Sequence, residues 1–127
     1  MQKIFFIGIG GFFGTLFRYS LSGAVQQASK SVSFPYGTLA VNLIGCLAVG
    51  FLSYLTEEFG LLNSVNRQMV FIGLLGGFTT FSTFMNETFH LTMDGRLWSS
   101  FFNVLLHVVF GFAAVWLGRI AAHAIWR

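Results

Sequence analysis

Four long apolar stretches, separated by short polar gaps, fill nearly the whole of this sequence. They cover residues 4–25, 36–55, 69–91 and 97–121. An α-helix needs about 20 mostly apolar residues to cross the hydrocarbon core of a bilayer. We therefore predict an all-α membrane protein, a single domain over residues 1–127 with four transmembrane helices.

The composition supports a lipid environment. Of the 127 residues, 55% are hydrophobic and 9% are charged, against roughly 25% charged residues in soluble domains. A chain this short cannot bury so much apolar surface in its own interior, because small folds keep a large surface for their volume. The net charge of +3 is small and dispersed, so we expect no nucleic-acid partner. The short gaps leave no room for a soluble catalytic domain.

The first stretch begins directly after Lys3 and in that respect resembles a signal peptide. We interpret it as a span, because no small-x-small cleavage pattern follows it and three further apolar stretches come later. Cys46 is the sole cysteine, which excludes an intrachain disulfide. We interpret it as a small core residue.

An even number of spans places both termini on one side of the membrane. That side carries Lys3, Arg67, Arg119 and Arg127, and the other side carries Lys30, Arg96 and, if its side chain reaches that surface, Arg18. This positive-inside bias is weak. It is compatible with insertion in both orientations, and also with one orientation marked by few charges.

Four short helices make a thin bundle with little interior, so we expect any solute pathway to lie between subunits rather than within one. Small residues recur at a spacing of four, at Gly10/Gly14, Gly73/Gly77 and Ala114/Gly118. Such pairs let neighbouring helices approach closely.

Residues 76–84 read Gly-Gly-Phe-Thr-Thr-Phe-Ser-Thr-Phe in the middle of the third apolar stretch. Glycines and hydroxyl residues in succession are poor helix formers. One interpretation is a break that frees backbone carbonyls at membrane depth, where they suit a small cation. The other is that the hydroxyls bond back to carbonyls and the helix merely bends.

Phe81, Phe84 and Asn42 each admit two interpretations. The phenylalanines share a helix face, and they either pack against lipid and core or offer electropositive ring edges to an anion. The amide of Asn42 lies within the second stretch, where it either bonds to another helix or donates an N–H to an anion.

Arg18 and Glu87 are the charged residues well inside the predicted spans. Arg18 either extends to the membrane surface or forms a basic mouth that concentrates anions. Glu87 is expected to pair with Arg18 or with another donor. Asn103 and His107 lie four apart on one face of the fourth stretch, and we interpret them as hydrogen-bonded packing residues.

The sequence resembles the Fluc family of fluoride channels, also called CrcB proteins. The matching positions are Gly37-Thr38-Leu39, Val41-Asn42-Leu43 with Gly45, and residues 76–84 with Glu87. Residues 14–18 are also similar to the first helix of that family. Chain length and the number of spans agree as well, so the resemblance covers essentially the whole sequence.

The resemblance implies an antiparallel, dual-topology homodimer with a broken third helix and two fluoride pores at its interface. It assigns Asn42 as a pore donor, Phe81 and Phe84 as ring edges, and Ser82 and Thr83 to a polar track. It places Arg18 near a vestibule, the carbonyls of Gly76 and Thr79 around a structural sodium ion, and Glu87 and His107 as supporting residues. Some family members carry hydroxyl residues in the fourth helix where this chain has His107, Phe110 and Gly111, so the contribution of that helix stays open.

The resemblance thus implies a fluoride-selective, passive channel that exports fluoride across the inner membrane. Fluoride is small and strongly hydrated, so many weak donors must replace its water without holding it. A proton-coupled exporter of the small multidrug type needs a carboxylate in the first span, which has none. A purely structural subunit is disfavoured by the buried polar residues. We expect no enzymatic activity, because no catalytic residue set or phosphate-binding loop is recognisable.

Overall fold

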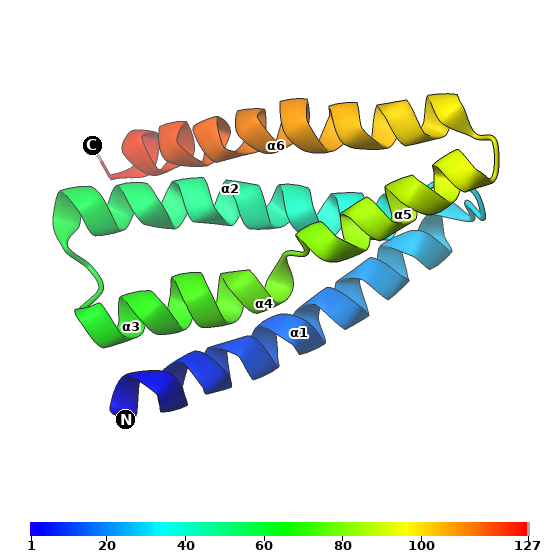
Figure 1. Cartoon of the computed structure of the whole chain (residues 1–127). Coiled ribbons are helices and arrows are strands. Elements are labelled where there is room, and N and C mark those ends of the chain that lie inside the picture. The colour runs from blue at the N-terminus through cyan, green and yellow to red at the C-terminus, as the bar shows by residue number, and fades with distance from the viewer. Residues whose placement is uncertain (127) are drawn as a thin grey trace.

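The computed structural model describes residues 1–126, and long helices account for most of them. The elements are α1 Gln2–Ser29, α2 Tyr36–Phe59, α3 Ser64–Gln68, a π-helical segment η1 Met69–Leu75, α4 Gly76–Phe78, α5 Phe81–Met93 and α6 Leu97–Ile125. The helices lie side by side along one direction, and both termini lie at the same end of the molecule, as the even number of spans predicts (Figure 1).

Four segments are long and apolar enough to cross a membrane. They are Gln2–Ser29, Tyr36–Phe59, Ser64–Met93 and Leu97–Ile125. The prediction of four spans is confirmed in number, and each helix extends past the predicted apolar stretch at one end or both. Helices end where a cap or turn ends the hydrogen-bond ladder rather than where hydropathy falls. Gly60, for example, ends α2 in the left-handed conformation at φ 60°, which glycine adopts without a steric penalty.

Close helix contacts occur where glycine removes the side chain. A Cβ atom at Gly10 or Gly14 of α1 would clash with backbone of the segment from Met69 to Phe78, and one at Gly118 of α6 would clash with the backbone of α2 at Leu47. The interpretation of these small residues as packing positions is confirmed. α1 therefore lies directly on η1 and α4, and α6 on α2.

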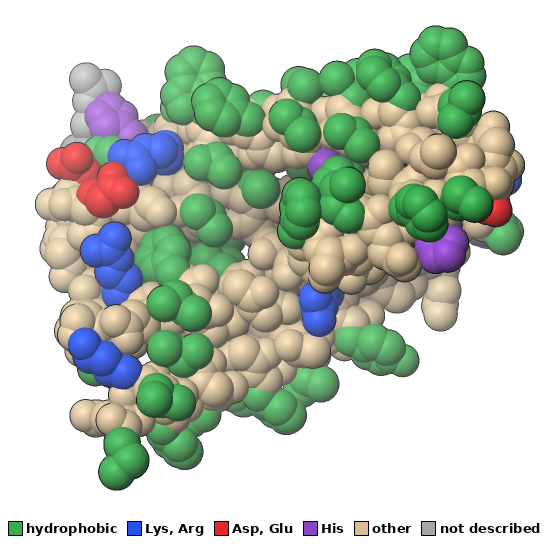
Figure 2. Space-filling view, in the orientation of Figure 1, with side chains coloured by type: hydrophobic (Ala, Val, Ile, Leu, Met, Phe, Trp, Pro, Cys, Tyr) green, Lys and Arg blue, Asp and Glu red, His purple; other side chains and the backbone are tan. Residues whose placement is uncertain are grey.

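The outer surface is apolar along the length of the molecule. Exposed large hydrophobic side chains include Phe12, Phe17, Phe81, Trp98, Phe112 and Trp116. Figure 2 shows hydrophobic side chains spread along this face, with most charged ones near the two ends and a basic side chain near the middle. At the end that holds the termini, Arg119 of α6 pairs with Glu57 of α2 at 2.8 Å. This distribution fits a lipid-facing exterior with polar ends.

Candidate functional site

The third span is interrupted between α4 and α5 (Figure 1). α4 ends at Phe78, and the next two residues are extended, Thr79 with φ −90° and ψ 160° and Thr80 with φ −152° and ψ 115°. α5 then starts at Phe81, and the side chain of Thr80 caps it by accepting a hydrogen bond from the N–H of Thr83 at 3.2 Å. The run of glycines and hydroxyls thus accommodates a gap in the helix.

The side chain of Asn42 bonds to the backbone that this gap exposes. The Thr80 N–H donates to Asn42 Oδ1 at 2.8 Å, and Asn42 Nδ2 donates to the Thr80 carbonyl at 3.1 Å. The Asn42 amide therefore replaces the helical hydrogen-bond partners that the N–H and the carbonyl of Thr80 lack at the gap. Because an amide nitrogen carries two hydrogens, a second N–H of Asn42 remains for another acceptor.

The gap also changes the partners of the preceding carbonyls. In a continuous helix the Thr80 N–H would donate to the Gly76 carbonyl, but here it donates to Asn42. Thr79 bonds back to the Leu75 carbonyl through both its N–H and its hydroxyl, each at 3.0 Å. Both interpretations of residues 76–84 therefore hold in part: a hydroxyl bonds back to a carbonyl, and the helix also ends. The carbonyl oxygens of Gly76 and Thr79 are the type of ligand that a hard monovalent cation binds.

An open groove of about 330 Å³ lies beside the gap. We call it the aromatic groove; its lining includes Asn42, Cys46, Thr79, Phe81, Phe84 and His107. α2 and α5 thereby bring three predicted pore residues, Asn42, Phe81 and Phe84, to one surface. At Gly45 a Cβ atom would overlap the methyl group of Thr79, so glycine lets α2 approach the gap closely enough for Asn42 to reach Thr80.

The two phenylalanines of this groove differ sharply in exposure. Phe81 is 75% exposed and Phe84 is 5% exposed. Their ring centroids are 5.7 Å apart with an interplanar angle of 64°, an edge-to-face arrangement. Phe84 also stacks on His107 of α6 with 4.1 Å between ring centroids. Both rings line the groove, and the edge of such a ring carries the positive part of the aromatic quadrupole.

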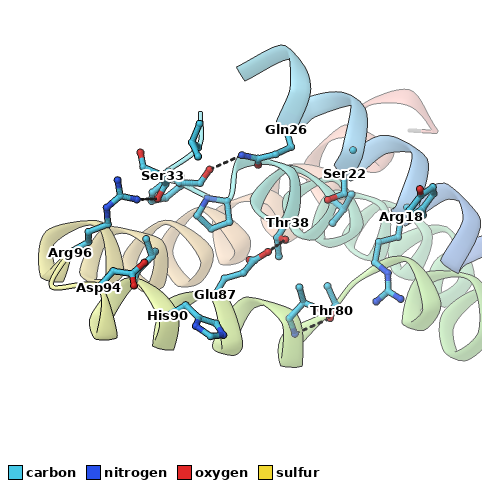
Figure 3. Close-up of a pocket in the computed structure, with 18 of the residues that line it drawn as sticks. Arg18, Ser22, Gln26, Ser33, Thr38, Thr80, Glu87, His90, Asp94 and Arg96 are labelled. Atoms are coloured by element: carbon cyan, nitrogen blue, oxygen red, sulfur yellow. Dashed lines mark hydrogen bonds between the residues drawn. The ribbon is translucent and has the colours of Figure 1, made fainter. Parts of the chain in front are cut away.

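A second open cavity of about 740 Å³ lies nearer the α1–α2 and α5–α6 turns. We call it the polar cavity; it is lined by residues that include Arg18, Ser22, Gln26, Thr38, Thr80, Thr83, Glu87 and His90 (Figure 3). Thr80 lines this cavity and the aromatic groove alike. The helix gap thus lies between the two.

Glu87 pairs with a hydroxyl and not with Arg18. The hydroxyl of Thr38 donates to Glu87 Oε1 at 2.6 Å, and Figure 3 shows Glu87 pointing toward Thr38 with Arg18 apart from both. Of the alternatives for Glu87, the other donor is the one observed. Arg18 is partly buried and lines the polar cavity, which fits the interpretation of a basic mouth better than a side chain extended onto the outer surface.

The remaining predicted residues lie at different places. Thr83 lines the polar cavity, whereas Ser82 is exposed and, within residues 1–126, is not among the residues that line either opening. His107 lines the aromatic groove, and its Nδ1 bonds to the Asn103 carbonyl at 2.8 Å, as expected for a hydrogen-bonded packing residue.

Sequence reasoning did not select Thr38 and Thr80 as site residues. A signal for Thr38 was present, because it precedes Asn42 by four residues and therefore shares a face of α2 with it. For Thr80, the sequence indicated a break or a bend in this region without indicating which backbone groups would need a partner.

This chain is similar to one known family and to proteins that share one name. A sequence model of the family described as "CrcB-like protein, Camphor Resistance (CrcB)" matches residues 5–119. The Fluoride-specific ion channel FluC 1 of Methanosarcina acetivorans is 47% identical over 122 residues, which are 96% of this chain and 92% of that protein.

Two further relatives carry the name Fluoride-specific ion channel FluC. The one from Geobacter sp. (strain M21) is 44% identical over 98% of this chain and 100% of its own length. The one from Methanocaldococcus jannaschii is 42% identical over 100% of this chain and 99% of its own length. The similarity therefore extends over nearly the whole chain.

Proposed function

Because this chain belongs to the CrcB family, we propose that it is a fluoride-selective channel that lets fluoride leave the cytoplasm passively. The observation that carries the proposal is the aromatic groove, where the Asn42 amide and the Phe81 and Phe84 rings meet. Relatives named as fluoride-specific channels span essentially the full chain. A channel forms and breaks no covalent bonds, so the chain is not an enzyme.

In the proposed pathway, fluoride exchanges its water for many weak donors. Arg18 raises the local anion concentration at the polar cavity. Thr83 and then the second N–H of Asn42 replace water molecules near the helix gap. Beyond them the edges of Phe81 and Phe84 attract the ion without binding it as tightly as an ammonium group would. Fluoride thus encounters no fixed positive charge inside the groove.

A second copy of the chain completes this pathway in our proposal. Phe81 is 75% exposed in the single chain, and both openings lie on the surface of a thin bundle with little interior of its own. A homodimer would cover the grooves and give two pores at its interface. Ser82, exposed at the start of α5, would face either that interface or lipid.

We propose that the two copies are antiparallel, since the weak charge bias permits insertion in both orientations. We place the channel in the inner membrane, because a channel there lets fluoride leave the cytoplasm. Labelling a terminal tag from each side of intact vesicles tests the orientation. Access from one side alone would rule out dual topology.

A structural sodium ion fits the backbone at the gap. The Gly76 carbonyl has lost its helical partner to Asn42, and the residues that the structure describes hold no cluster of three or more His, Cys, Asp or Glu side chains for a metal. Gly76 and Thr79 would hold sodium through carbonyl oxygens, and the same pair from the second copy would complete the coordination. The ion would then fix two helix ends to each other at the interface.

The proposal is tested by fluoride efflux from liposomes that contain the purified protein. A fluoride electrode records efflux while a potassium ionophore prevents charge build-up. We expect fast fluoride efflux, very slow chloride efflux and no dependence on an imposed proton gradient. Equal rates for chloride, or no fluoride efflux from a folded protein, would contradict the proposed function.

A further inference from the structure

A cluster of hydrogen bonds lies one turn beyond Phe84, between α5 and α6. Asn103 of α6 is completely buried, and its Nδ2 donates to Thr88 Oγ1 at 2.9 Å. The Thr88 hydroxyl in turn donates to the Phe84 carbonyl at 2.8 Å. Ser100 of α6 donates to the Thr88 carbonyl at 3.1 Å. Two α6 side chains thus bond to one residue of α5.

The direction of this relay is fixed by its ends. The Phe84 carbonyl can only accept, so the Thr88 hydroxyl donates its single hydrogen there. The same hydroxyl must therefore accept from Asn103. Asn103 therefore presents its NH₂ group to Thr88, and its Oδ1 is left as a buried acceptor without a partner in the described chain. The bonds from Asn103 and Ser100 to Thr88 cross between the helices, so they limit how far α5 can turn or shift against α6.

The same region of α6 also holds the other side of Phe84. The Asn103 carbonyl bonds to His107 Nδ1 at 2.8 Å, and the His107 ring stacks on Phe84. Because a carbonyl only accepts, Nδ1 carries the proton and fixes the orientation of the imidazole ring. Asn103 is thus connected to Phe84 twice, through its side chain by way of Thr88 and through its backbone by way of His107.

α5 requires such a constraint because it is separate from α4. The extended residues Thr79 and Thr80 interrupt the helix, so α4 does not set the rotation of α5 about its axis. α5 packs mainly on α6, and apolar side chains alone permit small rotations and shifts between two helices. Directional hydrogen bonds between membrane helices remove that freedom.

From this geometry we infer that Thr88 and Asn103 are positioning residues for the fluoride pathway, which hold α5 in the rotation that aims Phe84 and Phe81 into the aromatic groove. The inference rests on the proposed function. Neither residue lines the groove, so both act through Phe84. The relay sets the angle of the ring edges, and thereby the rate at which fluoride passes them.

Thr88→Val tests the inference, because valine keeps the shape of threonine and removes the hydroxyl. We expect fluoride flux to fall about three- to tenfold, in line with the modest worth of one hydrogen bond between membrane helices. Thr88→Ser, which keeps the hydroxyl, should restore nearly all of the flux. Thr56→Val is the matched control, since Thr56 of α2 makes the same kind of bond back to the Leu52 carbonyl away from the α5–α6 cluster, and its flux should stay near that of the wild type.

A double variant separates positioning from simple destabilisation. Thr88→Val alone leaves the buried NH₂ of Asn103 without a partner, whereas Thr88→Val combined with Asn103→Leu removes both polar groups and should recover thermal stability. If the relay positions Phe84, flux stays low in the double variant although stability returns. Recovery of flux together with stability would overturn the inference, as would wild-type flux in Thr88→Val. Absence of fluoride flux in the wild-type protein itself would instead overturn the proposed function.

Discussion

At the scale of single residues, Asn42 connects the fold to the proposed function. The two interpretations open at the sequence level, a bond to another helix and a donor to an anion, concern different hydrogens of one amide. One hydrogen bonds to Thr80 across 38 positions of sequence, and the other is available to the groove. The sequence indicated that Asn42 needed a partner, but it could not indicate Thr80, because that pairing depends on how α2 lies against the gap.

Asn42→Ala is expected to destabilise the protein and to abolish fluoride flux. The variant leaves the N–H and carbonyl of Thr80 without partners, at about 1–3 kcal/mol for each buried group. Thermal unfolding in detergent and fluoride efflux together measure both effects. Asn66→Ala is a suitable control, since Asn66 is exposed in α3 and should change neither quantity. Unchanged stability in Asn42→Ala would show that the gap does not depend on the amide.

At the scale of helices, the gap between α4 and α5 organises the site. Two glycines and the following hydroxyl residues indicated either a break or a bend, and the structure has a helix end together with back-bonding at Thr79. The helix bounds were less predictable, since hydropathy reports the lipid-facing length whereas caps decide where helices end. Asn103 was interpreted as a hydrogen-bonded packing residue, but its partner Thr88 was not predicted, because a threonine in a membrane helix is usually satisfied by its own backbone.

The proposed sodium site at this gap is testable through the backbone. Exchange of sodium for a large organic cation should weaken dimer association, which analytical ultracentrifugation in detergent measures. Thr79→Val should keep that sodium dependence, because the proposed ligand is the carbonyl and valine preserves the shape that packs on Gly45. A Thr79→Val dimer that no longer responds to sodium would contradict ligation by the backbone alone.

At the scale of the whole molecule, the proposed pathway requires more than a single chain. Composition predicted the lipid-facing surface and the thin interior, and the structure agrees, with large apolar side chains exposed along its length. The groove and the polar cavity are both open, and Thr80 lines both of them. We therefore propose that a second copy encloses a path of weak donors, which the sequence indicated through the lack of interior volume and through the family resemblance.

The central claim is that fluoride passes along the aromatic groove and meets the edges of its rings. The most direct test is fluoride efflux from liposomes with Phe81→Ile, compared with Phe89→Ile, which removes a similarly exposed ring on α5 that does not line the groove. We expect a fall of at least about tenfold for Phe81→Ile, the removal of one strong transition-state contact, with an intact dimer, and no change for Phe89→Ile. Equal flux in both variants would contradict the claim.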